Sequence, residues 1–479
     1  MKEFRALLKE KIKESGKNIS TISRESGVER TYLHKALSGE RMLPYHAVKK
    51  LCTYFNLTPH EEEIFCEYYN IQVQGIEKFE SRKIITHILN ELANLPFGME
   101  RTKKIGRSAG LPEEMNYTGI STGSYAVRNM ICNIVLQELR EENPKLYIFL
   151  PPQDEFLMYY LYNIFNEYQT DMEVWHIIPY FVNNDIQKNS GLEAFERILP
   201  IILTAREKYH SYYFYCKIED IAIPFPNYII TRRGILHISS DLTAAYYDVQ
   251  TDVVNYYRTF FNQAIQKSTS LLVVQQNILS ILQTYSETIA DNSYYTFMPQ
   301  PCMARFYTDE LIEKKVRQGL PGREMIVRQS QLKFAEISKV TGDYFTFFTE
   351  EGVRQFIQTG VISDIPTQMI EPLSVEERCQ LIRQLKDDIE NDSIMGRFVI
   401  TEKLMLPQYL SFSVTAKKQI EIFTLPQNEQ QESFYNIHVD EPILGEMFLD
   451  FVQYLPKSDL VFSKEETVKK LGALLEELL

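Results

Sequence analysis

Residues 18–44 read NISTISRESGVERTYLHKALSGERMLP, and they contain the strongest local pattern in the chain. Asn18 stands directly before an amphipathic segment, where its side chain can accept hydrogen bonds from the exposed N–H groups of a helix start. Gly27 interrupts the apolar spacing, and glycine readily adopts the left-handed backbone of a tight turn. Gly39 follows a second amphipathic segment, as glycine commonly does at a helix C-terminus. The stretch therefore predicts two short helices joined by a turn at Gly27.

The apolar and polar residues of this stretch separate onto two faces. The residues expected to pack inward are Ile19, Ile22, Val28, Leu33 and Leu37. The residues expected on the outer face of the second helix are Arg30, Thr31, His34 and Lys35. Arg41 and Pro44 begin the next segment. Two helices joined in this way can place the second of them in the major groove of DNA.

In these residues the sequence resembles the Cro/CI (Xre-type) helix-turn-helix family of bacterial and phage regulators. The resemblance covers roughly residues 1–70, and the positions that carry the family pattern are Ile22, Gly27, Val28, Leu33, Gly39 and Arg41. It implies five helices, at residues 4–15, 19–26, 30–38, 44–55 and 59–69. Two positions differ from the family: Glu29 replaces the usual capping Ser or Thr, and Leu37 stands where a polar residue is common.

The resemblance implies a sequence-specific DNA-binding transcriptional regulator, such as a repressor, that acts as a homodimer on double-stranded operator DNA. Arg30 is expected to make a bidentate contact to guanine, the commonest specific contact in the major groove. The residues expected near bases or the adjoining backbone are Thr31, His34 and Lys35. The residues expected at phosphates, which fix register without reading sequence, are Lys17, Ser20 and Arg41.

The distribution of charge supports this interpretation independently. Residues 1–56 contain eight Lys and four Arg against six Glu, a balance of +6. The whole chain carries −13, so the remaining residues carry −19. Affinity for nucleic acid comes largely from neutralising phosphates, and the cationic surplus is confined to the N-terminal segment. We expect the acidic remainder to stay away from DNA.

Size and composition limit the remaining possibilities. A chain of 479 residues is too long for one hydrophobic core, so several domains are expected. No run of eighteen apolar residues occurs, which argues against a membrane span and a membrane partner. The N-terminus begins with a charged amphipathic segment instead of a signal peptide, which predicts a cytoplasmic location. The six cysteines form no CxxC pair, so reduced core thiols are expected, with no metal and no cofactor.

Beyond residue 70, the sequence predicts a helical linker with an irregular loop at 71–140, followed by α/β sensor or dimerisation domains at 141–290 and 291–479. Within them, helices are expected at 243–266 and 271–290. The predicted fold class is therefore multidomain: an all-α five-helix helix-turn-helix domain followed by a mixed α/β C-terminal region. A duplicated α/β unit is one alternative for that region, because both halves end in a hairpin followed by an aromatic-rich helix.

The C-terminal region offers a few polar residues beside aromatic strands as ligand-binding candidates. They are Trp175, His176, Tyr213, Arg232 and Arg233. Two interpretations stay open for them: a pocket for a small-molecule or peptide effector, or core packing beside a charged hairpin tip. For the whole protein, the alternative to an effector-sensing regulator is an antitoxin or phage-type repressor whose C-terminal region binds a protein or peptide partner.

One string in the sequence has the spacing of a catalytic motif. Residues 119–123, GISTG, fit the G-x-S-x-G pattern of a nucleophile elbow. That motif needs a hydrophobic strand immediately before the serine turn, whereas the polar string PEEMNYT precedes it here. The eight histidines are dispersed, and no phosphate-loop, dinucleotide-binding or zinc-protease string occurs. We therefore expect a protein without enzymatic activity.

Overall fold

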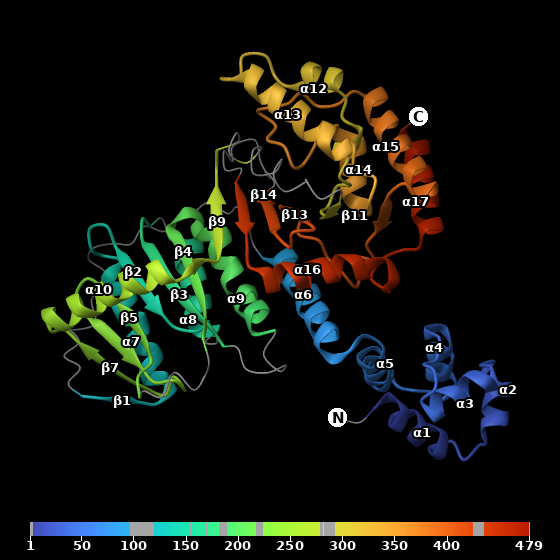
Figure 1. The fold of residues 1–479 in the computed structure, drawn as a ribbon, viewed down its shortest axis with the longest axis horizontal. Coiled ribbons are helices and arrows are strands. Elements are labelled where there is room, and N and C mark those ends of the chain that lie inside the picture. Colours follow the sequence, from blue (N-terminus) through green and yellow to red (C-terminus); the bar gives the residue numbers. More distant parts are fainter. Residues whose placement is uncertain are drawn as a thin grey trace. The chain divides into compact units, whose positions relative to one another are not determined.

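The structure, a computed structural model, describes residues 3–95, 119–152, 155–168, 170–181, 189–216, 224–277, 281, 293–424 and 435–478. Two compact units divide the chain, Met1–Lys83 and Ile84–Leu479. Figure 1 labels their helices and strands.

The first unit is entirely helical in its described part. Its helices are α1 (Phe4–Glu14), α2 (Ile19–Ser26), α3 (Arg30–Ser38), α4 (Tyr45–Tyr54), α5 (Pro59–Gln74) and the first residues of α6 (Ile76–Asn94). The Asn18 side chain accepts from the Thr21 N–H at 2.9 Å and so caps α2. Gly27 and Gly39 have φ angles of +66° and +84°, a left-handed backbone that ends α2 and α3 sharply. The core of this unit includes the fully buried Leu8, Ile22, Leu33, Val48 and Leu51.

The predicted fold class is wrong as stated. Most of the chain is built on two mixed sheets, of eight and seven strands, with helices packed on them. The helical unit does not end at residue 70 with a fifth helix either, because it continues into α6 as far as Lys83. Gly75, with φ +84°, is the single residue that separates α5 from α6. The side chains of Arg82 and Lys83 then bond back to Gln74 and Glu67 of α5 at 2.8 and 2.9 Å.

The first sheet of the second unit has the strand order β1-β7-β6-β5-β2-β3-β4-β8. Its strands are β1 (Ser121–Thr122), β2 (Lys145–Phe149), β3 (Glu173–Phe181), β4 (Tyr209–Cys216), β5 (Asn227–Ile230), β6 (Ile235–Ile238), β7 (Ala244–Asp248) and β8 (Thr269–Ser270). Strands β2, β3 and β4 run parallel, whereas β5, β6 and β7 form an antiparallel meander beginning beside β2. The associated helices are α7 (Ser124–Glu138), α8 (Glu155–Glu167), α9 (Ser190–Ala205) and α10 (Thr251–Lys267).

The second sheet has the order β12-β11-β10-β13-β14-β15-β9. Its strands are β9 (Leu272–Gln275), β10 (Tyr294–Phe297), β11 (Tyr344–Phe348), β12 (Met395–Phe398), β13 (Leu410–Val414), β14 (Ile420–Thr424) and β15 (Asn436–Val439). Three parallel strands, β10 to β12, are again followed by an antiparallel meander, and an earlier strand again closes the edge. The described helices here are α12 (Asp309–Lys315), α13 (Arg323–Ser338), α14 (Glu350–Thr359), α15 (Val375–Glu390), α16 (Pro442–Tyr454) and α17 (Lys464–Leu478).

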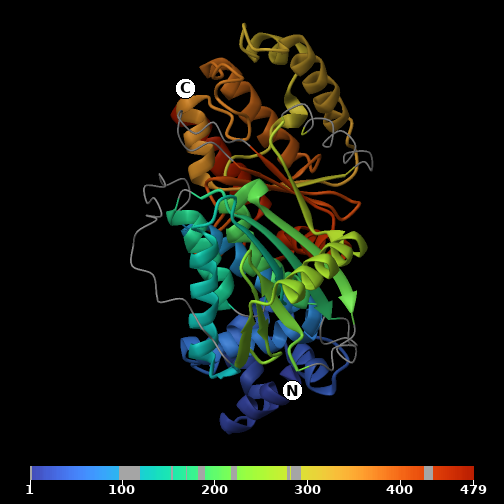
Figure 2. The same ribbon diagram turned by 90° about the vertical axis from the view of Figure 1, so that its left-hand side faces the viewer.

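The two sheets share one hydrophobic core. Helices α8 and α9 of the first sheet and α16 of the second contribute buried residues to the same cluster. The rings of Phe195 in α9 and Phe448 in α16 meet edge to face with centroids 6.1 Å apart. Helix α10 covers the opposite face of the first sheet, where Val254 and Phe261 pack on Ile177. Figures 1 and 2 show these layers from two directions.

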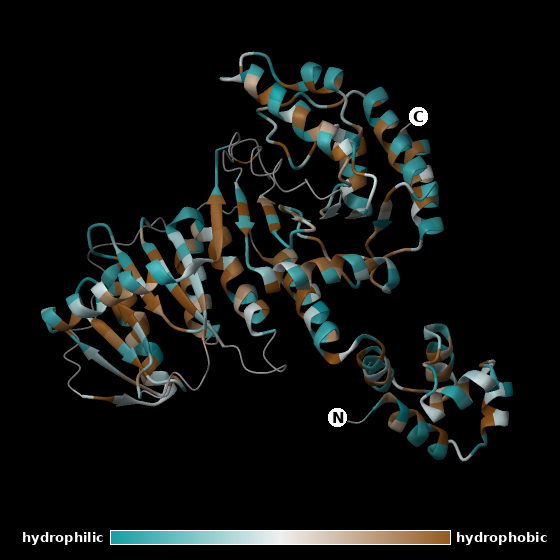
Figure 3. Ribbon diagram, in the orientation of Figure 1, coloured by the Kyte–Doolittle hydropathy of each residue, from teal (hydrophilic) through white to brown (hydrophobic). Residues whose placement is uncertain are grey.

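The hydropathy of the strands and helices agrees with this arrangement of layers. In Figure 3 strand β9 is predominantly hydrophobic, whereas α15 and α17 alternate between hydrophilic and hydrophobic residues along their length. Such alternation is typical of helices that bury one side and expose the other. Within the described parts of the chain, the helices are each too short or too polar to cross a membrane.

Two helices predicted from the sequence are corrected here. The predicted helix at 243–266 begins too early, since Ala244–Asp248 is strand β7 and the helix starts at Thr251. In the predicted helix at 271–290, residues Leu272–Gln275 form strand β9, and residues 278–280 and 282–290 lie outside the described residues. In both cases apolar residues that fit helical spacing pair instead with a neighbouring strand, β6 or β15. The predicted domain boundary at 290 stays a prediction.

Candidate functional site

The outer face of α3 presents the polar residues that the sequence placed there. Leu33 and Ala36 are buried, whereas Arg30, Thr31 and His34 are exposed. The Arg30 Nε donates to the His34 Nε2 at 3.3 Å, so these two side chains, one helical turn apart, lie side by side. This bond does not use the two Nη atoms of Arg30 or the Nδ1 of His34, and both residues are exposed on the same surface.

The cations around this face have different surroundings. Lys17 Nζ lies 2.6 Å from Glu25 Oε2, and half-buried Lys35 lies 3.3 Å from Glu40 Oε1. Ser20 and Arg41 are exposed. Exposed ion pairs contribute little to stability, so a phosphate can compete with these carboxylates for the two lysines.

Two further cations lie next to this face that sequence reasoning missed. Lys50 Nζ donates to the Gly27 carbonyl at 3.2 Å, at the turn between α2 and α3. Arg5 donates to the Ser38 carbonyl at 3.3 Å, at the end of α3. Both come from other helices, so no local sequence pattern could place them here. Glu29, the residue that departs from the family pattern, makes no side-chain cap to α3.

One group of side chains in the first unit has metal-ligating chemistry. The Sγ atoms of Cys52 and Cys66 and a carboxylate oxygen of Glu62 all lie within 4.8 Å of one another. These are three ligands, and a structural zinc site has four. Lys49 Nζ already lies 2.8 Å from Glu62 Oε1. The hydrogen bond from Cys52, with the charge of Lys49 nearby, lowers the pKa of Cys66 to about 7.

The five ligand-binding candidates of the sequence analysis are not brought together. Buried His176 lies between the Tyr209 hydroxyl, 2.6 Å from its Nδ1, and the Leu150 carbonyl, 2.7 Å from its Nε2. Tyr213 is also buried and stacks on Tyr180, with ring centroids 5.2 Å apart. Both candidates are packed within the core that the two sheets share.

The other three candidates lie elsewhere. Trp175 belongs to the face of the sheet that α10 covers, where it stacks on His210 at 4.2 Å between centroids. Arg232 and Arg233 form the exposed tip between β5 and β6, and Arg233 Nε lies 2.7 Å from Glu141 Oε1. The described contacts thus match core packing and a charged hairpin tip, the second of the two interpretations.

His176 predicts a pH dependence of stability. Burial lowers its pKa to about 4 against an ordinary 6.5, although the bond to the Leu150 carbonyl opposes this. Between pH 6.5 and 4 His176 is protonated in the unfolded chain but stays neutral in the folded chain. The free energy of unfolding therefore falls as the pH falls, by about 3 kcal/mol at pH 4. We expect His176→Gln to flatten this dependence, measured by urea unfolding followed through Trp175, the only tryptophan.

A second buried histidine, His237, contributes to the same pH dependence. Burial lowers its pKa to about 4 as well, so the variant should keep part of the pH dependence. His60 is exposed, and His60→Gln should leave the profile unchanged. A His176→Gln profile that overlays the wild-type profile would contradict the assignment.

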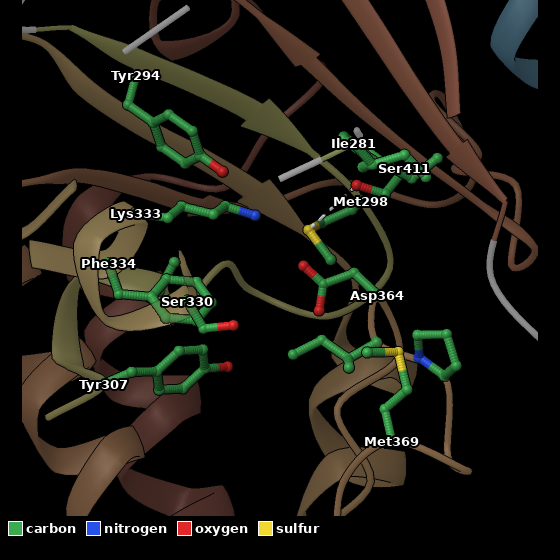
Figure 4. A pocket seen from close by; sticks show the side chains of 14 residues that line it. Ile281, Tyr294, Met298, Tyr307, Ser330, Lys333, Phe334, Asp364, Met369 and Ser411 are labelled. Atoms are coloured by element: carbon green, nitrogen blue, oxygen red, sulfur yellow. Dashed lines mark hydrogen bonds between the residues drawn. The ribbon is translucent and has the colours of Figure 1, made fainter. Parts of the chain in front are cut away.

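A polar cavity lies on the second sheet, between α13 and the segment 364–369. It has a volume of about 70 Å³. Figure 4 shows Lys333 and Asp364 on opposite sides of it with their charged ends turned toward each other. The hydroxyl groups that line the same space belong to Tyr294, Tyr307, Ser330 and Ser411. The Ser411 hydroxyl donates to the Met298 sulfur at 3.6 Å.

The electrostatics of the cavity follow from its burial. Burial lowers the pKa of Lys333, and the negative charge of Asp364 partly opposes this shift. Burial raises the pKa of Asp364, and the charge of Lys333 partly lowers it again. Burial also raises the pKa of Tyr307 well above its usual value, so this hydroxyl remains a donor. Perturbed titratable groups of opposite sign in one cavity are typical of a functional site.

A buried polar network lies on the neighbouring strands β14 and β15. The Glu421 carboxylate is 2.6 Å from His438 Nδ1 and accepts from the Asn436 amide, also at 2.6 Å. Burial lowers the pKa of His438, but the bond to Glu421 outweighs it and raises the pKa overall. A histidine oriented by a carboxylate occurs in many active sites. The expectation that this protein is not an enzyme therefore stays a prediction.

The G-x-S-x-G string does not form a nucleophile elbow. Ser121 and Thr122 form the two-residue edge strand β1, which pairs with Ala244 and Ala245 of β7. A nucleophile elbow instead follows a buried central strand. The string therefore connects the edge strand β1 to the start of α7.

Comparisons with known proteins do not identify a function for this chain. No protein-family model matches the chain, and no curated protein matches it. Among solved structures, the chain is similar to the crystal structure of phosphatidylserine synthase from Haemophilus influenzae Rd KW20. The identity is 9%, the alignment covers 83% of this chain and 97% of that chain, and the TM-score is 0.25. A similarity at this level carries no argument about this chain.

Proposed function

We propose that this protein is a sequence-specific DNA-binding transcriptional regulator, and that α3 enters the major groove. The observation that carries the proposal is the division of α3 into two faces. Leu33 is fully buried, whereas Arg30 and His34 lie together on the exposed side. A short helix held rigidly by its apolar side and presenting an arginine on the other has what direct readout needs.

The surroundings of α3 support the same proposal. Cations from α1, from the loop before α2 and from α4 lie close to the ends of α2 and α3: Arg5, Lys17 and Lys50. Side chains in such positions bind phosphates and fix the register of a reading helix. A homodimer on two half-sites is part of the proposal, because one helix of this length reads only a few base pairs.

The proposal predicts that Arg30→Ala weakens operator binding by about 1–3 kcal/mol and relaxes specificity at one base pair. Arg41→Ala should weaken binding to all sequences about equally and reduce the slope of log K against log salt by about one. Both effects can be measured by fluorescence anisotropy on duplexes from the promoter of the chain's own gene, over a series of salt concentrations.

Lys13→Ala is the matched control for these variants. Lys13 is exposed on α1, in the same unit, and its loss removes the same charge from a surface outside the proposed interface. Equal binding of wild type and Arg30→Ala to cognate and random duplexes would refute the proposal. So would binding that does not respond to salt, since phosphate contacts release counterions.

A further inference from the structure

The first unit contains two cysteines, Cys52 and Cys66, and its fold brings them together. Cys52 lies on α4 and Cys66 on α5 (Figure 1), and both are buried. Their Sγ atoms and a carboxylate oxygen of Glu62 all lie within 4.8 Å of one another. In the described part of the chain, no other three His, Cys, Asp or Glu side chains converge in this way.

The two helices explain why these three donors meet. Glu62 and Cys66 are four residues apart on α5, so their side chains lie on the same face, one turn apart. Donors with this spacing on one helix are also used by the H-E-x-x-H zinc motif. Cys52 comes from the neighbouring helix α4 and supplies the third donor.

The distance between the sulfur atoms suits a single ion. Two sulfur atoms on one tetrahedral zinc ion lie about 3.8 Å apart, because each zinc–sulfur bond is about 2.3 Å long. The Sγ atoms of Cys52 and Cys66 lie within 4.8 Å of each other. They therefore need to approach by no more than about 1 Å to share an ion. Small rotations of the two cysteine side chains can supply this movement.

Lys49 holds one oxygen of the Glu62 carboxylate. Its Nζ lies 2.8 Å from Glu62 Oε1 and 5.7 Å from the centre of the Tyr45 ring. A carboxylate has two oxygens, so this bond leaves one of them for an ion. A carboxylate that binds a metal ion is itself usually hydrogen-bonded in this way, which fixes its orientation.

The charges of the site favour a divalent ion. When zinc replaces the protons of the two thiols, its two positive charges balance the two thiolates, and Lys49 balances Glu62. The filled site is therefore neutral, which avoids the cost of a buried net charge. A monovalent ion such as copper(I) on the same two thiolates would leave one negative charge uncompensated.

We propose that Cys52, Glu62 and Cys66 bind one zinc ion that joins α4 to α5, with Lys49 hydrogen-bonded to the ligating carboxylate. As each sulfur binds the ion, its S–H bond breaks and the proton goes to the solvent. Three protein ligands leave the fourth position of a tetrahedral site to water. The site lies within the helical unit and does not require DNA, so this proposal and the proposed function can each fail without the other.

The experiment is isothermal titration calorimetry of the reduced, metal-free full chain with zinc chloride, without DNA. We expect one zinc ion to bind per chain. A parallel titration uses cobalt(II), which accepts similar donors, and should produce the charge-transfer absorption of a cobalt–thiolate bond. This absorption reports sulfur ligands directly and needs no variant.

Substitutions then locate the site. Cys52→Ser and Cys66→Ser should each reduce the affinity for zinc by about 100-fold or more, since even the loss of an outer hydrogen-bond partner costs about 10–100-fold. Glu62→Gln should reduce it by about tenfold or more, because an amide brings no negative charge to the ion. Circular dichroism reports whether each variant keeps its helices.

Two further variants are matched controls. Glu63 is exposed, and Glu63→Gln removes the same charge from the position next to Glu62. Cys132 lies on α7, in the second unit, and Cys132→Ser removes a thiol that is not part of the site. Both variants should bind zinc as the wild type does.

Three outcomes would overturn the proposal. The first is that the wild-type chain binds no zinc, or that cobalt(II) binds without the thiolate absorption. The second is that folded Cys52→Ser and Cys66→Ser bind zinc as the wild type does, which would place the ion elsewhere. The third is that Glu62→Gln keeps full affinity, which would make the cluster a two-thiolate site, a donor set that suits copper(I).

Discussion

Replacing Gly445 by alanine should destabilise the second unit by more than about 4 kcal/mol, the range of the largest single-residue effects. A methyl group at this position in α16 would overlap the carbonyl oxygen of Lys418. Lys418 lies in the turn between β13 and β14 with φ +65°, and its N–H donates to the Thr415 carbonyl at 2.9 Å. Because hydrogen bonds hold this turn, it cannot move away from α16 without a loss of stability. Urea unfolding followed by circular dichroism measures the loss.

Gly472 provides the matched control. It lies within α17, and a methyl group there would meet only the Lys386 side chain, at an ordinary contact distance of 3.9 Å. Gly472→Ala should therefore stabilise the protein by about 1 kcal/mol, the usual gain when alanine replaces glycine in a helix. Similar changes for the two variants would show that α16 does not approach the turn as closely as described.

Replacing Glu138 by alanine should cost about 3 kcal/mol, because it leaves two partly buried backbone N–H groups without their acceptor. The Glu138 carboxylate, at the end of α7, accepts from the Lys145 N–H at 2.9 Å and from the Arg232 N–H at 2.7 Å. It thereby connects the start of β2 with the hairpin between β5 and β6. Unfolding in urea, followed through the fluorescence of Trp175, measures the change.

Two variants bracket this prediction. Glu138→Gln keeps one acceptor oxygen and should lose about half as much stability as the alanine variant. Glu142 is exposed, and Glu142→Ala should change stability by no more than about 0.5 kcal/mol. If Glu138→Ala proved as stable as Glu142→Ala, the carboxylate could not hold the hairpin in place.

The sequence was most informative where structure depends on local chemistry. Helices α2 and α3 lie at the residues expected for them, because Asn18, Gly27 and Gly39 act through their own backbone and nearest neighbours. The outer face of α3 could be inferred for the same reason, since helical periodicity alone places Thr31 on the opposite side of the helix from Leu33. The prediction of the fold class was wrong because the fold class depends on contacts between residues far apart in the sequence. The boundary between the two units falls within α6, after Lys83, and its position depends on contacts that no local pattern encodes.

The site in the second sheet depends on such contacts throughout. Lys333 lies on α13 and Asp364 in the segment after α14, and both line one cavity with Tyr294 of β10 and Ser411 of β13. Neither residue stands in a recognisable string. Conversely, the sequence suggested a ligand site at three polar or large residues beside strands: Trp175, His176 and Tyr213. Successive side chains of a strand, however, point to opposite faces of the sheet. Adjacent residues such as Trp175 and His176 therefore point into different cores.

The passage from β8 to β9 has a practical consequence. Ser270 pairs with Tyr212 in the first sheet, and Leu272 pairs with Val439 in the second, so Leu271 alone joins them. Cutting the gene near this residue would separate two sheets that share one hydrophobic core, and each fragment would expose apolar surface prone to aggregation. Useful truncations should instead keep Ile84–Leu479 whole, with the affinity tag and any fused reporter placed outside it.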